Sequence, residues 1–259
     1  MVELNKNYFA DCREVLKTIP DKSINLFLED MPYNTTQCDW EYEVDLKEYW
    51  ELRLPKLADK GLFVLTANQP FTTDLIMSNR KMFKYEIVWL KSQATNFLNS
   101  KKQPLRRNEN IIVFYPKQCK YFPIITKKNP KNIRSVSLKN NSSQCYGEYK
   151  SGDYRSIPLD MSYPDNIIYA ENQQENIHPT GKPIELFSYF IKTYTNENDI
   201  VFDGYSGSGT TAIACIRNNR KYIICENKKE YFDLQTKRIQ EEIDKTSLFN
   251  SLGGGDKIN

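Results

Sequence analysis

A short apolar run, a glycine-rich loop and an amphipathic stretch follow one another between residues 199 and 217, and this succession constrains the fold more than any other feature. Residues 199–203 predict a buried strand, and residues 210–217 predict a helix. A loop that joins a strand to a helix in this way places backbone N–H groups and the positive end of a helix dipole at the carboxyl edge of a sheet, where ligands bind in α/β folds.

Strands and helices alternate on both sides of a long irregular region, which predicts an α/β fold with a parallel sheet and helices on both faces. Before that region we expect strands at 24–29, 62–66 and 85–90, and helices at 70–82 and at 45–60, the latter ended by Gly61. After it we expect helices at 184–194, 210–217 and 229–245, and strands at 199–203 and 222–225.

The irregular region covers about residues 92–176, where Asn, Ser, Lys, Tyr and Pro are frequent and only residues 110–115 form a clear strand pattern. We interpret it as an insertion into a single α/β domain composed of residues 1–91 and 177–250. The last segment, residues 251–259, reads SLGGGDKIN and is expected to be a flexible tail.

The positive charge of the chain is concentrated in this insertion. The whole chain carries a formal charge of only +3, yet residues 91–140 contain twelve Lys and Arg and one acidic residue, Glu109. Together with Tyr115, Tyr121 and Phe122, these cations are typical of a surface that binds a phosphate backbone. They are equally typical of a solvated surface in a lysine-rich protein, and charge alone leaves both interpretations open.

Composition excludes several protein classes. No apolar run approaches the roughly 20 residues that span a bilayer, and the N-terminal MVELNKNYFADCREVL lacks the basic start and apolar stretch of a signal peptide. The six cysteines include no Cys-x-x-Cys pair and His178 is the single histidine, so we expect no zinc site. Scattered cysteines without a signal peptide indicate a reducing cytoplasm.

The glycine loop resembles two common nucleotide-binding patterns. Gly204 and Gly209 have the spacing of a phosphate-binding P-loop, but Thr210 stands where that motif requires lysine, so we reject a nucleotidase. Gly207, Gly209 and Ala212 match the glycine pattern of dinucleotide sites, which is a weak signal by itself.

Asp203 argues against a dinucleotide, because a carboxylate at the tip of the strand would repel a pyrophosphate. A ligand with an ammonium group would be attracted instead. S-adenosylmethionine has such a group, a carboxylate for the N–H groups of the loop, and ribose hydroxyls for Glu226 at the end of the next strand. The remaining alternative is a Gly/Ser turn that binds no ligand.

A second group of residues, Asp30-Met31-Pro32-Tyr33, follows the predicted strand at 24–29. Alone it is an ordinary turn, but at the edge of a parallel sheet it supplies the groups needed to methylate an exocyclic base amine. The Asp30 carboxylate and the Met31 carbonyl can accept the two N–H hydrogens, which exposes the lone pair, and the carboxylate stabilises the developing positive charge. Tyr33 can stack on the base, which must be flipped out of the duplex.

These residues resemble the motifs of the DNA amino-methyltransferases, which methylate adenine N6 or cytosine N4 with S-adenosylmethionine. The catalytic motif [DNS]-P-P-[YF] is similar to residues 30–33, and the cofactor loop D-P-F-x-G-S-G-T-T to residues 203–211. The motif H-P-T-x-K-P matches residues 178–183, and G-D-C…L…P-D resembles residues 10–21. Their order is that of the beta class, the resemblance spans about residues 4–240, and residues 33–40 look like bacteriophage-borne members.

The resemblance implies a Rossmann-like methyltransferase sheet with a target-recognition region inserted at 92–176. The catalytic residues that it implies are Asp30, Met31, Pro32 and Tyr33. The cofactor-binding residues that it implies are Asp11, Cys12, Asp30, His178, Thr180, Lys182, Asp203, Tyr205, Ser206, Gly207, Ser208, Gly209, Thr210, Thr211, Glu226 and Asn227. Within the insertion we expect Lys101, Lys102, Arg106 and Arg107 to contact DNA.

Individual roles follow from the same resemblance. Asp203 would face the methionine ammonium, Glu226 the ribose hydroxyls and Asp11 the adenine amino group of the cofactor. The chain departs from the family pattern where Met31 replaces the first proline of the catalytic motif and where Gly204-Tyr205 replaces Pro-Phe. The carbonyl of residue 31 and an aromatic side chain at 205 are kept, so we expect activity; Gly181 occupies the variable position of its motif.

We therefore expect an enzyme that flips a base out of double-stranded DNA and methylates adenine N6 at a specific site, since cytosine-N4 members more often carry Ser at position 30. The alternatives are a cytosine-N4 enzyme of the same fold and an inactive DNA-binding relative. We expect S-adenosylmethionine as cofactor, no metal, no membrane partner, a possible homodimer, and a cytoplasmic, bacterial or phage-encoded protein that acts alone or in a restriction–modification system.

Overall fold

The computed structural model describes residues 2–33, 44–128, 157–158, 160–171 and 181–251. The chain divides into two compact units, one made of Met1–Phe122 with Asn166–Asn259 and the other of Pro123–Asp165. In the smaller unit, strands β6 (Thr126–Lys127) and β7 (Met161–Ser162) form an antiparallel pair.

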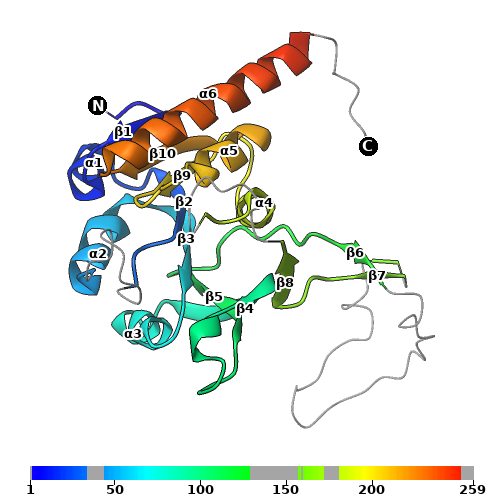
Figure 1. The fold of residues 1–259 in the computed structure, drawn as a ribbon. Coiled ribbons are helices and arrows are strands. Elements are labelled where there is room, and N and C mark those ends of the chain that lie inside the picture. The colour runs from blue at the N-terminus through cyan, green and yellow to red at the C-terminus, as the bar shows by residue number, and fades with distance from the viewer. Residues whose placement is uncertain (1, 34–43, 129–156, 159, 172–180, 252–259) are drawn as a thin grey trace. The chain divides into compact units, whose positions relative to one another are not determined.

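An eight-stranded sheet in the order β1-β10-β9-β2-β3-β5-β4-β8 organises the larger unit (Figure 1). Its strands are β1 (Lys6–Phe9), β2 (Ile24–Glu29), β3 (Leu57–Ala67), β4 (Phe83–Thr95), β5 (Arg106–Phe114), β8 (Ile167–Ala170), β9 (Ile200–Asp203) and β10 (Lys221–Glu226). Neighbours are parallel except where β5 pairs antiparallel with β3 and with β4. The predicted parallel sheet is thus a mixed sheet, because β4 and β5 are joined as a hairpin and not through a crossover helix.

Helices cover both faces of this sheet, as the sequence predicts. The helices are α1 (Cys12–Thr18), α2 (Leu46–Arg53), α3 (Phe71–Ser78), α4 (Ile184–Tyr194), α5 (Thr210–Arg217) and α6 (Lys229–Ser251). Successive side chains of a strand point to opposite faces. Accordingly, Leu26 and Leu28 of β2 join a core formed with α4 and α5, whereas Phe27 joins a second core formed with α1, α2 and α3.

The first predicted helix was too long. Helix α2 ends at Arg53, and a 3₁₀ turn at Leu54–Lys56 leads directly into β3, five residues before the strand predicted at 62–66. Pro55 lies in that turn, and proline disfavours a continuing α-helix because its ring clashes with the preceding turn and it has no N–H to donate. Gly61 therefore lies inside β3 and ends no helix.

The region predicted as an insertion contains strands of the main sheet. The end of β4, all of β5 and all of β8 lie within residues 92–176, whereas the smaller compact unit covers only Pro123–Asp165. The extent of a target-recognition region stays a prediction. Of the predicted tail at 251–259, only Ser251 is described, as the last residue of α6. Among the described residues, no helix is long and apolar enough to cross a membrane.

Candidate active site

Three acidic residues lie where parallel strands of the sheet end. Asp30 follows β2, Asp203 ends β9 and Glu226 ends β10, and β9 pairs with both β2 and β10. The carboxyl ends of parallel strands meet at one edge, which is where α/β sheets bind ligands. The structure therefore brings the predicted catalytic residue and two predicted cofactor residues to the same edge.

The Asp30 carboxylate is held by three side chains. The Tyr33 hydroxyl donates a hydrogen bond of 2.6 Å to Oδ1, Thr66 donates to the same oxygen, and Lys182 Nζ lies 2.5 Å from Oδ2. Burial alone would raise the pKa of Asp30, but the Lys182 ammonium and the hydroxyl donors outweigh it, and the pKa is lowered. The side chain is 23% exposed, so the ionised carboxylate remains accessible.

Lys182 also belongs to a buried chain of alternating charges. Its Nζ lies 3.2 Å from Oε1 of Glu109, a buried residue of β5, and Lys91 Nζ of β4 lies 2.6 Å from the other oxygen of Glu109. Burial would lower the pKa of Lys182, but Asp30 and Glu109 raise it above its usual range. The ammonium of Lys182 contacts the predicted catalytic carboxylate, and the predicted role of Lys182 toward the cofactor stays a prediction.

Sequence reasoning missed Thr66, Lys91 and Glu109 as site residues. Thr66 lies in an apolar strand and carries no signal. The sequence did single out Glu109, because it is the only acidic residue among residues 91–140. A single carboxylate kept within a strongly basic segment indicates a specific cationic partner.

Tyr33 stands beside a second aromatic ring. Its ring centroid lies 5.4 Å from that of Phe71, at the start of α3, in a stacked arrangement. Burial and the neighbouring Asp30 and Glu109 carboxylates raise the pKa of the Tyr33 hydroxyl well above its usual value, so it stays a donor. Of the two residues between Asp30 and Tyr33 in the sequence, Met31 is buried in the core and Pro32 is half-buried.

Asp203 is a buried carboxylate whose described partners are uncharged. It accepts hydrogen bonds from the Tyr205 N–H (2.9 Å) and the Thr211 hydroxyl (2.5 Å). Burial raises its pKa to about 8, against the lowering effect of those donors. A cation placed against Asp203 would relieve this destabilisation of the charged form.

The glycine loop is fastened to the end of β10 on one side. The Gly207 N–H donates to Glu226 Oε2 (3.0 Å), and the Lys228 N–H donates to Oε1 (2.8 Å). Burial raises the pKa of Glu226, while these backbone donors oppose that shift. The Ser206 hydroxyl lies within hydrogen-bonding distance of the Cys225 carbonyl and of Gln235 Oε1.

On its other side the loop meets the segment that carries Lys182. The Thr210 hydroxyl donates to the Lys182 carbonyl (3.3 Å) and lies 3.4 Å from the Ser208 hydroxyl. Gly209 has a φ of +80°, and a Cβ there would approach Gln235 Cβ to 2.9 Å, so the position requires glycine. The cofactor loop and the residue that contacts Asp30 are thus mechanically connected.

Beneath the loop lies an ion pair that the sequence did not suggest. Arg53 Nε and Nη2 donate to Glu29 at 2.9 Å each, both side chains are fully buried, and the Gly204 N–H donates to Glu29 Oε1 at 3.0 Å. Tyr49 donates to the same carboxylate at 2.5 Å. A Cβ on residue 204 would come within 2.9 Å of Glu29 and Arg53. This accounts for glycine where the family pattern has proline, since proline has neither the N–H nor the small volume.

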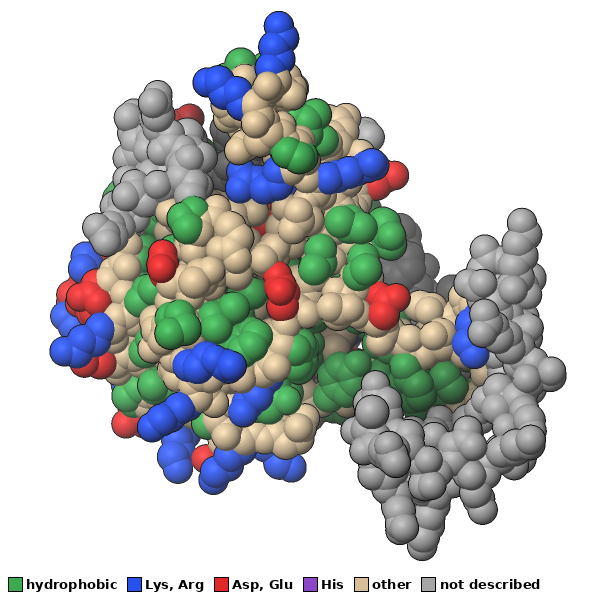
Figure 2. Space-filling view, turned by 90° about the horizontal axis from the view of Figure 1, so that it is seen from below, with side chains coloured by type: hydrophobic (Ala, Val, Ile, Leu, Met, Phe, Trp, Pro, Cys, Tyr) green, Lys and Arg blue, Asp and Glu red, His purple; other side chains and the backbone are tan. Residues whose placement is uncertain are grey.

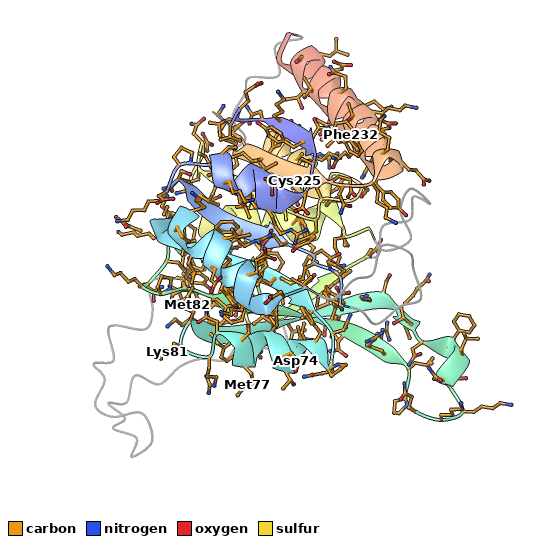
Figure 3. All side chains as sticks on the ribbon, turned by 90° about the vertical axis from the view of Figure 1, so that its left-hand side faces the viewer. Asp74, Met77, Lys81, Met82, Cys225 and Phe232 are labelled. Atoms are coloured by element: carbon orange, nitrogen blue, oxygen red, sulfur yellow. The ribbon has the colours of Figure 1, made fainter. Side chains whose placement is uncertain are left out.

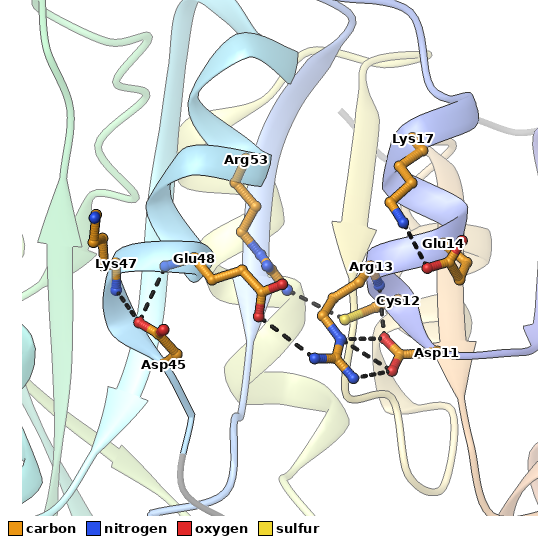
Figure 4. A network of polar contacts seen from close by, with 9 residues as sticks. All are labelled: Asp11, Cys12, Arg13, Glu14, Lys17, Asp45, Lys47, Glu48 and Arg53. Carbon is orange, nitrogen blue, oxygen red and sulfur yellow. Dashed lines mark hydrogen bonds and ion pairs between the residues drawn. The ribbon is translucent and has the colours of Figure 1, made fainter.

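Asp11 and Cys12 lie at the start of α1 (Figure 4). The Asp11 carboxylate caps the helix and pairs with Arg13 Nη2 at 2.6 Å, and Arg13 Nη1 lies 3.5 Å from Glu48. The Cys12 sulfur accepts from Arg53 Nη2 at 3.5 Å, and burial raises the pKa of its thiol. The role of Asp11 toward a cofactor adenine stays a prediction.

The remaining predicted residues are placed as follows. His178 and Thr180 lie outside the described residues. Asn227 is exposed just beyond β10. The predicted DNA contacts are all exposed in the hairpin between β4 and β5, namely Lys101, Lys102, Arg106 and Arg107. Within the described part of the chain, no group of His, Cys, Asp and Glu could hold a metal ion.

Comparison with known proteins identifies relatives along nearly the whole chain. A family model described as DNA methylase, of the N6/N4 type, matches residues 24–238. The DNA adenine methyltransferase YhdJ of Escherichia coli strain K12 is 27% identical over 252 residues, which cover 89% of this chain and 81% of that protein.

Two solved structures share the fold. The complex of M1.HpyAVI with SAM is 23% identical, covers 90% of this chain and 98% of its own, and has a TM-score of 0.60. The PvuII DNA methyltransferase, described as cytosine-N4-specific, is 19% identical, covers 99% of this chain and 95% of its own, and has a TM-score of 0.64.

Proposed function

The chain belongs to the family of DNA methylases that modify adenine N6 or cytosine N4, and from this we propose that it methylates adenine N6 at a specific site in double-stranded DNA. The observation that carries the proposal is the ionised Asp30 carboxylate at the end of β2, with Tyr33 beside it. Both groups belong to the motif that resembles the family's catalytic motif. S-adenosylmethionine is the methyl donor.

The glycine loop fits this cofactor. Asp203 is a buried carboxylate whose pKa is raised to about 8, and a ligand ammonium would stabilise its ionised form. Gly209 allows the loop to turn with a positive φ against α6, and Glu226 stands at the next strand end, where it could bind ribose hydroxyls. When bound, the cofactor supplies an electrophilic methyl group on a sulfonium.

Asp30 would act by accepting an N–H of the target amine. The amine lone pair is delocalised into the base, and a hydrogen bond to the carboxylate makes it available and stabilises the positive charge that develops on nitrogen. Asp30 Oδ1 accepts from Tyr33 and Thr66 and Oδ2 accepts from Lys182, so an N–H of the base can use the free lone pair of Oδ2 or replace the contact with Lys182. Lys182 can withdraw without losing its counter-charge, because Glu109 lies 3.2 Å from its ammonium.

Tyr33 would stack on the flipped base. Its hydroxyl contact with Asp30 places the ring next to the carboxylate, and Phe71 supports it from behind in a stacked arrangement. The proposal includes base flipping, since a paired base inside the duplex could not reach a carboxylate at the edge of the sheet.

Product analysis tests the proposal. Purified protein is incubated with isotopically labelled S-adenosylmethionine and mixed-sequence unmethylated DNA, which is digested to nucleosides for mass spectrometry. We expect labelled N6-methyldeoxyadenosine. Labelled N4-methyldeoxycytidine would overturn the choice of adenine. Cytosine N4 is the alternative target because the PvuII enzyme, which shares the fold, is described as cytosine-N4-specific. Cofactor binding without any label would favour an inactive DNA-binding relative.

The cellular setting is part of the same proposal. YhdJ comes from Escherichia coli, and a second relative, M.BglII of Bacillus subtilis, is a type II methyltransferase. We place this protein in the bacterial cytoplasm, where it would act on the host or phage genome, alone or beside a restriction enzyme.

Cofactor binding is expected to release protons below pH 8. Asp203 is protonated in much of the free protein at pH 7, because burial raises its pKa to about 8, and it must ionise to face an ammonium. Affinity should therefore rise with pH between 6.5 and 8.5. Isothermal titration calorimetry in buffers of different ionisation enthalpy measures the release.

The Asp203→Asn variant should lose that proton release and bind the cofactor roughly 100-fold more weakly. It should also lose a pH dependence of folding, because a carboxyl whose pKa is raised in the folded state destabilises that state as pH rises from about 4 to 8. The control is Asp59→Asn, an exposed aspartate of β3 that should change neither quantity. Unchanged proton release in Asp203→Asn would contradict the assignment.

A further inference from the structure

The hairpin between β4 and β5 extends beyond the candidate active site. Its strands pair from Phe83 opposite Phe114 to Thr95 opposite Arg106, and the 3₁₀ turn at Phe97–Asn99 lies in the loop between them. Figure 3 shows this hairpin projecting away from the α/β body. The ion pair between Lys91 and the buried Glu109 lies where the hairpin begins to extend past the candidate active site.

The tip of the hairpin presents apolar side chains to solvent. Phe97 is 72% exposed, Leu98 is 84% exposed, and Leu105 on the returning side is 44% exposed. Adjacent large apolar side chains at the end of a projection cost free energy in water, and such groups mark surfaces that become buried in a complex. Figure 2 shows another view of the molecule, in which Lys and Arg side chains stand beside hydrophobic ones.

Cations surround this apolar tip. Lys101, Lys102, Arg106 and Arg107 are all exposed, and residues 91–108 contain no Asp or Glu. Arg107 also donates to the carbonyls of Lys91 and Ser92, at 3.2 Å each, and so braces the base of the hairpin. The combination fits a polyanion with an apolar interior, which is the chemistry of a DNA duplex with its phosphates outside and stacked bases inside.

The distance between the hairpin tip and Asp30 is compatible with contact to the duplex around a target base. Glu109 shares Lys182 with Asp30, and Arg106 lies three residues before Glu109 on β5. At about 3.3 Å per residue the tip begins roughly 10 Å beyond the site, a span of about three base-pair steps. The tip therefore stands within reach of the duplex from which a base would be drawn toward Asp30.

We propose that Phe97 and Leu98 form a wedge that enters the base stack next to the target base and holds the duplex open, while the neighbouring cations contact phosphates. The proposal rests on the proposed function. Insertion of apolar side chains unstacks base pairs and is repaid by their burial and by contacts to the opened duplex. Phe97 and Leu98, which lie outside every motif, would thus lower the free-energy cost of base flipping.

The test compares binding to a matched 30-base-pair duplex and to the same duplex with one mismatch, by fluorescence anisotropy. Opening costs less at a mismatch. Wild-type protein should prefer the mismatched duplex by roughly tenfold, and the Phe97→Ala/Leu98→Ala variant should bind both alike with an unchanged salt dependence. The Lys101→Ala/Lys102→Ala variant should keep the preference for the mismatched duplex but show a weaker salt dependence, with a slope lower by about 2.

The matched control is Met77→Ala, which removes an apolar side chain of α3 that is 66% exposed and should behave as wild type. A wild-type protein without mismatch preference, or a double variant that keeps it, would overturn the wedge. Binding to anionic lipid vesicles in preference to either duplex would overturn it too and indicate a membrane surface. The binding assay needs no methyl transfer, so failure of the proposed function appears separately, as absence of methylated nucleoside.

Discussion

Methyl transfer by the Asp30→Ala variant is expected to fall by roughly a thousandfold or more, while its affinity for S-adenosylmethionine stays within a few-fold of wild type. This carboxylate lies beside Tyr33, and the Lys182 ammonium and the hydroxyl donors hold its pKa low. Without it, nothing would draw the amine lone pair out of the ring or stabilise the charge on nitrogen. Single-turnover transfer of a labelled methyl group measures the first quantity and calorimetry the second.

The variant should remain folded, because its buried lysine keeps a partner. Lys182 lies 3.2 Å from Glu109, so loss of Asp30 does not leave an uncompensated ammonium in the interior. The control is Asp74→Ala, which removes an exposed carboxylate from α3 and should leave transfer unchanged. Transfer at the wild-type rate in Asp30→Ala, with normal cofactor affinity, would refute the assigned role.

Replacement of Arg53 by methionine should lower the free energy of unfolding by about 3–5 kcal/mol. The guanidinium is fully buried against Glu29, and its removal leaves that carboxylate without a counter-charge. Arg53 also lies 4.0 Å from the centroid of the Tyr49 ring, a cation–π contact that would be lost. Urea denaturation followed by circular dichroism measures the change.

Arg13 provides a matched control for this change. It forms ion pairs with Asp11 and Glu48, but its side chain is 53% exposed (Figure 4). Exposed pairs contribute about 0–1 kcal/mol, so Arg13→Met should be nearly neutral. Equal stability losses in the two variants would show that burial of the Arg53–Glu29 pair is not what matters.

A double variant separates stability from site geometry. In Arg53→Met/Glu29→Met the stranded charge is gone, and much of the lost stability should return. The double variant also removes the acceptor of the Gly204 N–H, which donates to Glu29 at 3.0 Å. We expect the double variant to bind the cofactor more weakly than wild type even where its stability has returned, which would show that the pair positions the loop.

The central elements of the fold could be predicted from local sequence, and the edges could not. The strands at 24–29 and 222–225 and the helix at 184–194 were predicted almost to their ends, because they are buried or strongly amphipathic. The strand β8 was missed, since it is short and partly exposed at the edge of the sheet. The direction of β5 depends on its hairpin with β4, which periodicity does not encode.

The same distinction holds for the site. Asp30, Asp203 and Glu226 could be predicted because each directly follows or ends a strand. Arg53 and Glu109 could not be paired with their partners, because they come from elements far apart in the chain and obey no motif spacing. Buried charge networks depend on tertiary contacts, and only the three-dimensional arrangement identifies them.

The pairing of β2 with β9 has a consequence for synthesis of the protein. Glu29 and Gly204, which meet at this junction, are separated by 175 residues of chain. At roughly 5–20 residues per second, β2 leaves the ribosome about 10–35 seconds before its neighbour exists. During that interval the backbone N–H and C=O groups on that edge of β2 have no β-partner, and neither half of the site can function. A nascent chain of this protein is thus expected to depend on chaperones until its final third has emerged.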